Sequence, residues 1–175
     1  MHRAVAIANE FLKRAGSGGL TQMQLQKLVY FAHGWALALR DAPLVAEDVE
    51  AWNYGPVYRD LYDHTKYFGK DPIERLITPD DDEAARFFSR SKDPKAPYEA
   101  ELTDYERQLI DAVWMRYGKL SGARLSALTH QRNTPWFDTF KSGRSEAIDN
   151  ERIKQHYTEL AAKARVRLAD AASAA

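Results

Sequence analysis

The side chains that could do chemistry are five histidines and 25 carboxylates, and their spacing fits no metal or acid–base site. No His-x-x-x-His pair occurs, whereas a zinc site needs three or four converging ligands. Asp63 precedes His64 directly, but adjacent side chains diverge on a helix. The run Asp80-Asp81-Asp82-Glu83 lacks the alternating ligands and internal glycine of a calcium loop, and it is typical of negative charge at a helix start. We therefore expect no metal and no cofactor.

Nucleophile and phosphate-binding motifs are also missing from the sequence. Gly16-Ser17-Gly18-Gly19 has no downstream Lys-Ser or Lys-Thr, so it is no phosphate-binding loop, and no Gly-x-Ser-x-Gly elbow occurs. The chain has no cysteine, which excludes thiolate chemistry and disulfides and fits a reducing cytoplasm. The prediction is that the protein is not an enzyme. The alternative is a catalytic site assembled from scattered residues such as Asp63 and His64.

The most distinctive stretch is EAWNYGPVYRDLY, residues 50–62. Its four aromatic side chains could form a binding surface, because such rings pack well and present a polar tip to a partner. They could equally form a structural corner. In that interpretation Asn53, Tyr54 and Gly55 make a turn and Pro56 occupies the first position of the next helix. The residues alone favour the structural corner and leave the interface open.

Helix-start signals divide the rest of the chain into helices. Capping boxes occur at Thr21 with Gln24 and at Thr103 with Glu106, because each pairs a threonine with an amide or acid three residues later. Further starts are predicted at residues 121, 134 and 149, and a weaker helix over 81–90. We predict a mainly α fold: a single compact domain of about six to eight helices, with at most a small β element near residues 44–53. The domain spans 1–170, and an Ala-rich tail over 171–175 is expected to fray.

Charge and hydropathy set limits on partners. The formal net charge is zero and 45% of the residues are hydrophobic, which predicts a folded, cytoplasmic protein with no membrane association. Segment 71–106 is acidic and residues 107–175 are basic, as expected for solvated helix surfaces or for a polarised surface that steers a charged protein. The predicted helices 103–117 and 121–131 have helix-turn-helix lengths. Arg124 and Arg132 would be the DNA-reading side chains of such a motif, so a DNA-binding regulator stays open.

Four ordered blocks carry a family resemblance. They are LQKLVYFAHGWALAL (25–39), PLVAEDVEAWNYGPVYRDLY (43–62), LSALTHQRNTPW (125–136) and DNERIKQHY (149–157). Together they resemble the Panacea domain of the SocA-like antitoxins, over roughly residues 3–160. The resemblance implies an antitoxin of a bacterial type II toxin–antitoxin system that neutralises a cognate protein toxin by direct binding. It implies no catalytic residues.

The same resemblance leaves the mechanism open. One branch of the family acts as a proteolytic adaptor that delivers its toxin to the ClpXP protease, and the terminal Ala-Ala is either a protease-recognised tail or an ordinary frayed end. The identity of the toxin and the oligomeric state stay open as well. As a partner-binding surface we nominate the aromatic block and the basic C-terminal part: Trp52, Tyr54, Tyr58, Tyr62, Arg144, Arg152 and Lys154.

Overall fold

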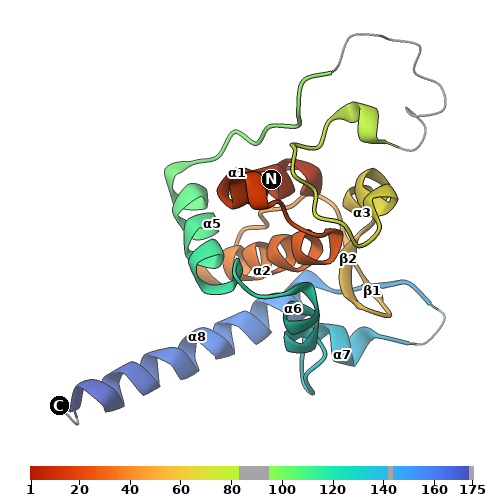
Figure 1. Cartoon of the computed structure of the whole chain (residues 1–175). Coiled ribbons are helices and arrows are strands. Elements are labelled where there is room, and N and C mark those ends of the chain that lie inside the picture. The colour runs from red at the N-terminus through yellow and green to blue at the C-terminus, as the bar shows by residue number, and fades with distance from the viewer. Residues whose placement is uncertain (83–94, 142–143, 174–175) are drawn as a thin grey trace.

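The computed structural model of the chain describes residues 1–82, 95–141 and 144–173. Over these residues it has seven α-helices and a small three-stranded sheet, which confirms the mainly α prediction (Figure 1). The helices are α1 (Ala4–Ala15), α2 (Gln22–Arg40), α3 (Arg59–Thr65), α5 (Asp104–Tyr117), α6 (Gly122–Thr129), α7 (Pro135–Thr139) and α8 (Asn150–Ser173). The strands are β1 (Val49–Trp52), β2 (Gly55–Tyr58) and β3 (Glu146–Ala147), and short 3-10 turns lie at Gly16–Gly18, Lys66–Phe68 and Pro79–Asp81. Most of the helix predicted over 81–90 lies outside the described residues.

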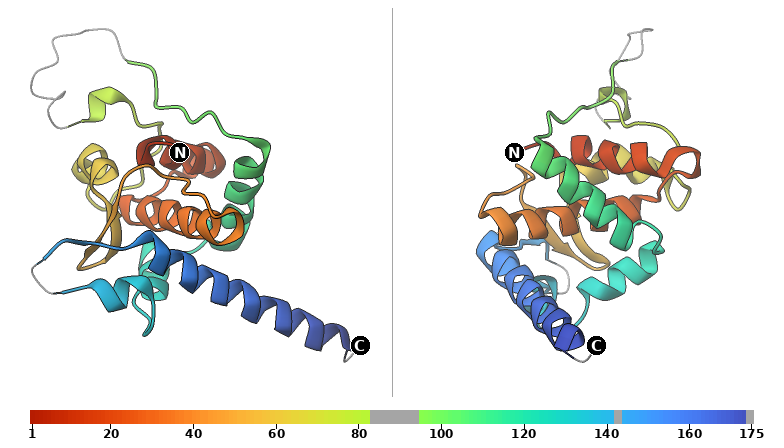
Figure 2. Two further views of the ribbon diagram at one scale, coloured as in Figure 1. Left: turned by 180° about the vertical axis from the view of Figure 1, so that it is seen from behind. Right: turned by 90° about the vertical axis from the view of Figure 1, so that its left-hand side faces the viewer.

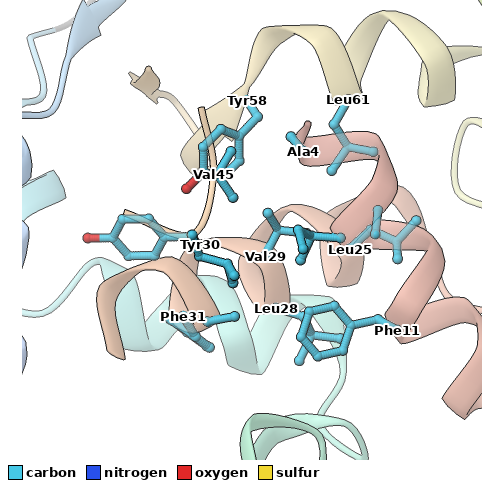
Figure 3. Packing of buried hydrophobic residues seen from close by; sticks show 14 of the residues in the cluster. Ala4, Phe11, Leu25, Leu28, Val29, Tyr30, Phe31, Val45, Tyr58 and Leu61 are labelled. Carbon is cyan, nitrogen blue, oxygen red and sulfur yellow. The ribbon is translucent and has the colours of Figure 1, made fainter. Parts of the chain in front are cut away.

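Helix α2 is the centre of the fold. It packs against α1, α5, α6, α8 and β2, and every residue from 25 to 34 is buried (Figures 1 and 3). Its start follows the predicted capping box: Thr21 Oγ1 accepts from the Gln24 amide at 3.3 Å, and Gln24 Oε1 accepts from the Thr21 amide at 3.0 Å. Because the helix is covered all round, the polar residues within it are buried too.

The small sheet corrects one local prediction. Pro56 does not begin a helix, because Gly55–Tyr58 forms β2, which pairs antiparallel with β1 in the register Ala51↔Pro56. The strand order is β2-β1-β3, so β2 is an edge strand, where a residue without an N–H is tolerated. Helix α3 begins only at Arg59. The turn residues are Asn53 and Tyr54, and Gly55 follows them with φ +106°, a backbone conformation that favours glycine.

Helix α8 has a packed half and a projecting half. Ile153 and Tyr157 are buried, and the Tyr157 ring lies 5.1 Å from the Trp35 ring, so this half is fixed to α2. Beyond it the helix extends away from the body, as Figure 1 and the left view of Figure 2 show, and Val166 is exposed. The helix continues to Ser173, into the segment for which fraying is predicted, and residues 174–175 lie outside the described part.

No helix within the described ranges is both long enough and apolar enough to cross a membrane.

Candidate partner-binding site

A pocket of about 470 Å³ opens between the start of α2 and the β1–β2 hairpin. Helix α2 forms one face of the pocket and the hairpin forms a second. Helix α3 contributes the Tyr62 ring, and the segment before β3 contributes Arg144 at the edge. The lining residues are Gln22, Met23, Gln26, Lys27, Trp52, Asn53, Tyr54, Val57, Tyr62, Arg144 and Ser145. The pocket therefore brings together residues that are more than a hundred positions apart in the sequence.

The hairpin that forms one wall is fixed from behind by α6 and α7. Ser126 Oγ donates to the carbonyl of Tyr54 at 2.9 Å, and Trp136 Nε1 donates to the carbonyl of Trp52 at 2.8 Å. Both acceptors are backbone atoms at or beside the turn. These bonds satisfy carbonyls that the short turn leaves free, and they set the position of the hairpin relative to α2.

Aromatic rings form the outer part of the pocket. The Trp52 and Tyr62 ring centroids are 4.8 Å apart, and the Arg59 guanidinium lies 5.1 Å from the Trp52 ring. The Glu50 carboxylate accepts from Trp52 Nε1 at 2.8 Å and from two nitrogens of Arg59 at 2.8 and 3.0 Å. The Trp52 indole is thus held in one orientation, while Tyr54 at the turn is 72% exposed.

A buried lysine lies deeper in the pocket wall. Lys27 is only 1% exposed, and its Nζ donates to the carbonyl of Pro56 at 2.9 Å. Among the described residues no carboxylate forms an ion pair with it. Burial without a counter-ion lowers the pKa of Lys27 to about 7, because desolvation disfavours the charged amine.

Gly55 leaves the space that the Lys27 side chain occupies. A Cβ at this position would lie 2.6 Å from Lys27 Cε and 2.7 Å from Thr129 Oγ1. Any side chain here would displace the lysine or α6. The glycine of the aromatic block therefore serves two purposes, since it completes the turn and admits the Lys27 side chain.

The nominated partner-binding residues divide into three groups in the structure. Trp52, Tyr54, Tyr62 and Arg144 line the pocket together. Tyr58 is completely buried in the core and presents no surface to a partner (Figure 3).

Arg152 and Lys154 lie apart from the pocket, on α8. Lys154 Nζ pairs with Asp41 at 2.6 Å, and Arg152 Nη1 lies 3.4 Å from Thr139 Oγ1. Contact of these residues with a partner stays a prediction.

Lys27, Gln22 and Met23 carried no motif or spacing that marked them as site residues. The packing of the hairpin against α2 brings them to the pocket.

Asp63 and His64, the residues of the alternative catalytic site, bond to different partners in the structure. His64 is buried, its Nδ1 lies 2.8 Å from the Asp60 carbonyl and its Nε2 lies 3.1 Å from the Tyr98 hydroxyl. Asp63 instead pairs with Lys66 at 3.2 Å. Within the described part of the chain, no three His, Asp or Glu side chains cluster as metal ligands.

His33 of α2 is buried against the surrounding chain. The Val45 amide donates to Nδ1 at 3.2 Å, so Nε2 carries the proton and donates to Asn150 Oδ1 at 2.9 Å. Burial lowers the pKa of His33, which matches this neutral tautomer. His33 is therefore a structural tie between α2, the Val45 segment and the start of α8.

The helix-turn-helix alternative has its two helices in place as α5 and α6. Leu125 and Thr129 of α6 are buried, and Arg124 and Arg132 are exposed. DNA reading by these two arginines stays a prediction.

Comparison with known proteins gives the class of this chain. The family model described as "Antitoxin SocA-like, Panacea domain" matches residues 25–137, a span that runs from within α2 to within α7. The chain belongs to the SocA-like antitoxin family, which confirms the resemblance. Among curated proteins it is similar to Antitoxin SocA of Caulobacter vibrioides (strain NA1000 / CB15N), with 31% identity over 136 residues that cover 76% of this chain and 68% of the relative. No solved structure matches.

Proposed function

We propose that this chain is the antitoxin of a bacterial type II toxin–antitoxin system and that it neutralises a protein toxin in the cytoplasm by binding it directly. The observation that carries the proposal is the family match over residues 25–137 together with 31% identity to a curated antitoxin. Direct binding is an activity that needs a surface rather than a reactive group. It is therefore compatible with a pocket whose lining combines aromatic rings with Lys27 and Arg144.

The contact surface in this proposal is the pocket with its exposed rim. Trp52 and Tyr62 offer ring area that costs little side-chain entropy to fix, because the two rings already pack against each other and the Trp52 indole is hydrogen-bonded to Glu50. Tyr54 projects from the turn and can reach a partner's surface. Arg144 at the edge supplies a charge that attracts an acidic surface.

Co-expression with the neighbouring gene tests the proposal. The product of that gene should arrest growth when expressed alone, and growth should recover when this chain is co-expressed. The two proteins should also co-purify as a complex. If toxicity persists with this chain present at a comparable level, the antitoxin proposal is wrong.

Proteolytic adaptor action is the second candidate, in which this chain would deliver the toxin to ClpXP. An adaptor needs one surface for its cargo and another for the protease. The chain has a second exposed region in the projecting half of α8, well separated along the fold from the hairpin (Figure 2). Rescue in a strain without ClpXP discriminates between the mechanisms: direct occlusion predicts that rescue persists, and adaptor action predicts that it disappears.

A further inference from the structure

We infer that the pocket recognises a carboxylate: an aspartate or glutamate side chain of the bound toxin, next to an apolar or aromatic residue, enters the pocket and pairs with Lys27. This inference rests on the proposed function and names the chemistry by which the partner is recognised.

The charges of the lining point to an anionic occupant. Among the described residues that line the pocket, Lys27 and Arg144 are the two cationic ones and none is an aspartate or glutamate. An ammonium group has three donors, and Lys27 uses one of them on the Pro56 carbonyl. A buried charge is stable only when it is paired, so the fold leaves open the position of a counter-ion.

A second unpartnered group faces the same pocket. The side-chain nitrogen of Gln22, one helical turn before Gln26 and on the same face of α2, is buried and has no hydrogen-bond partner in the described part of the chain. Lys27 and Gln22 therefore both have N–H donors that lack a hydrogen-bond acceptor. An ionised carboxylate is acceptor-only and has about four lone-pair positions, so it supplies the kind of group that these donors lack.

The remaining walls define what accompanies the carboxylate. Met23 and Val57 are apolar, and the Trp52 and Tyr62 rings stand beside them. A pocket of about 470 Å³ holds more than a carboxylate. The preferred segment therefore has an acidic residue flanked by an apolar or aromatic one, as in interface anchors that combine ring packing with a desolvated ion pair.

Lys27→Met tests the ion pair, because methionine keeps the length of the side chain and removes its charge. Isothermal titration of the purified chain with its toxin should show at least about a tenfold loss of affinity, as expected when one member of a buried pair is removed. Lys70→Met, which removes an exposed lysine outside the pocket, should bind like the wild type. Wild-type affinity of a folded Lys27→Met protein would overturn the inference and leave Lys27 as an anchor for the Pro56 carbonyl only.

Arg144→Ala provides a second variant in case Lys27→Met does not fold. Arg144 is exposed, so its removal leaves the core intact, and the inference expects weaker toxin binding with a reduced dependence on salt. Unchanged affinity together with an unchanged salt dependence would count against an acidic occupant.

Proton uptake gives a readout that a purely structural lysine would not produce. Burial lowers the pKa of Lys27 to about 7, so Lys27 is more neutral near pH 8 than near pH 6. Pairing with a carboxylate favours the charged amine, so toxin binding should take up more protons near pH 8 than near pH 6. Calorimetry in buffers of different ionisation enthalpy measures this difference. Equal uptake at the two pH values in the wild type would contradict the inference.

Measuring proton uptake with Lys27→Met as well as with the wild type controls for the other titratable groups around Lys27. Tyr54, Tyr62 and Arg144 of the lining are present in both the wild type and Lys27→Met. His130 of α6, whose Nε2 lies 3.3 Å from the Asn53 carbonyl, is common to the wild type and Lys27→Met. The difference in uptake between the two proteins therefore reports Lys27.

Two further measurements identify the occupant. Replacing each toxin Asp by Asn and each Glu by Gln in turn should reveal one position whose loss is not additive with Lys27→Met. If benzoate alone binds the purified chain at micromolar concentration, the site is one for a free small carboxylate and the inference is wrong. Failure of the proposed function looks different, since the wild-type chain would then neither bind the toxin nor rescue growth.

Discussion

The side-chain amide of Gln26 forms hydrogen bonds to both backbone groups of Tyr58. The Tyr58 N–H donates to Gln26 Oε1 at 2.8 Å, and Gln26 Nε2 donates to the Tyr58 carbonyl at 3.1 Å. An amide side chain thereby replaces a strand neighbour for the last residue of β2 and joins the edge of the sheet to the central helix. The hairpin wall and the α2 face of the pocket are held together by this pair.

Gln26→Leu should therefore loosen β2 from α2. The substitution leaves a buried N–H and a buried carbonyl without partners, which should lower the free energy of unfolding by about 2–4 kcal/mol. Urea denaturation followed by circular dichroism measures the loss. Gln155→Leu is the matched control, because Gln155 is exposed on α8 and its change should stay within about 0.5 kcal/mol. Equal stabilities of the two variants would show that the clamp contributes little.

Replacement by alanine should have different effects at two tyrosines of the aromatic block: loss of stability at Tyr58 and loss of toxin binding at Tyr54. Tyr58→Ala empties a completely buried site and should cost about 3–5 kcal/mol in unfolding free energy. Tyr54→Ala removes an exposed ring and should leave stability within about 0.5 kcal/mol while weakening toxin binding. Thermal melts and pull-down with the toxin separate the two effects. A strongly destabilised Tyr54→Ala protein would contradict the exposed position of the ring.

Gly34→Ala should detach α8 from α2. An alanine Cβ at this position would overlap the Tyr157 ring, which packs directly on the glycine. Overpacking costs about 1–3 kcal/mol and better helix propensity returns about 1 kcal/mol, so we expect a net loss of up to about 2 kcal/mol. Gly18→Ala is the matched control, since nothing lies within 4 Å of a Cβ there. Guanidinium unfolding should show lower stability only for Gly34→Ala.

Lys27 should make stability depend on pH in the alkaline range. Burial lowers its pKa from 10.5 to about 7 in the folded chain, so between these values the unfolded chain binds more protons than the folded one. Stability should therefore rise with pH through this window. Urea unfolding of the wild type and Lys27→Met between about pH 7.5 and pH 9.5 should show that the variant loses this rise. Parallel pH profiles of the two proteins would contradict an uncompensated buried amine.

The chosen pH range keeps other groups out of this measurement. His33 and His156 have lowered pKa values and act below the window, and burial raises the pKa values of Tyr58 and Tyr157, which act above it.

Sequence reasoning succeeded where the signal is local. The caps at Thr21, Thr103, Ser121 and Thr134 each depend on residues at most three positions away, and all four begin helices in the structure. Pro56 was misassigned because its place is decided by a distant partner. Proline suits both the first turn of a helix and an edge strand, and only the pairing with β1 selects the strand.

The pocket was predictable only in part. Four of its aromatic and basic residues stood out by their type, but Lys27 did not, because its burial depends on the hairpin closing over α2. A lysine within an amphipathic helix is ordinarily on the solvent face. The one local sign of burial is the apolar run of residues 28–32 that follows Lys27 directly.

The projecting half of α8 has a practical consequence for work on the complex. A helix of 24 residues is about 36 Å long, so a fluorophore or affinity tag attached at its end would be carried clear of the pocket. The opposite terminus offers no such freedom, because the His2 backbone amide and carbonyl bond to Leu44 and Ala46 at 2.8 and 2.9 Å. Surface immobilisation of this protein for binding measurements is best done through its C-terminal end.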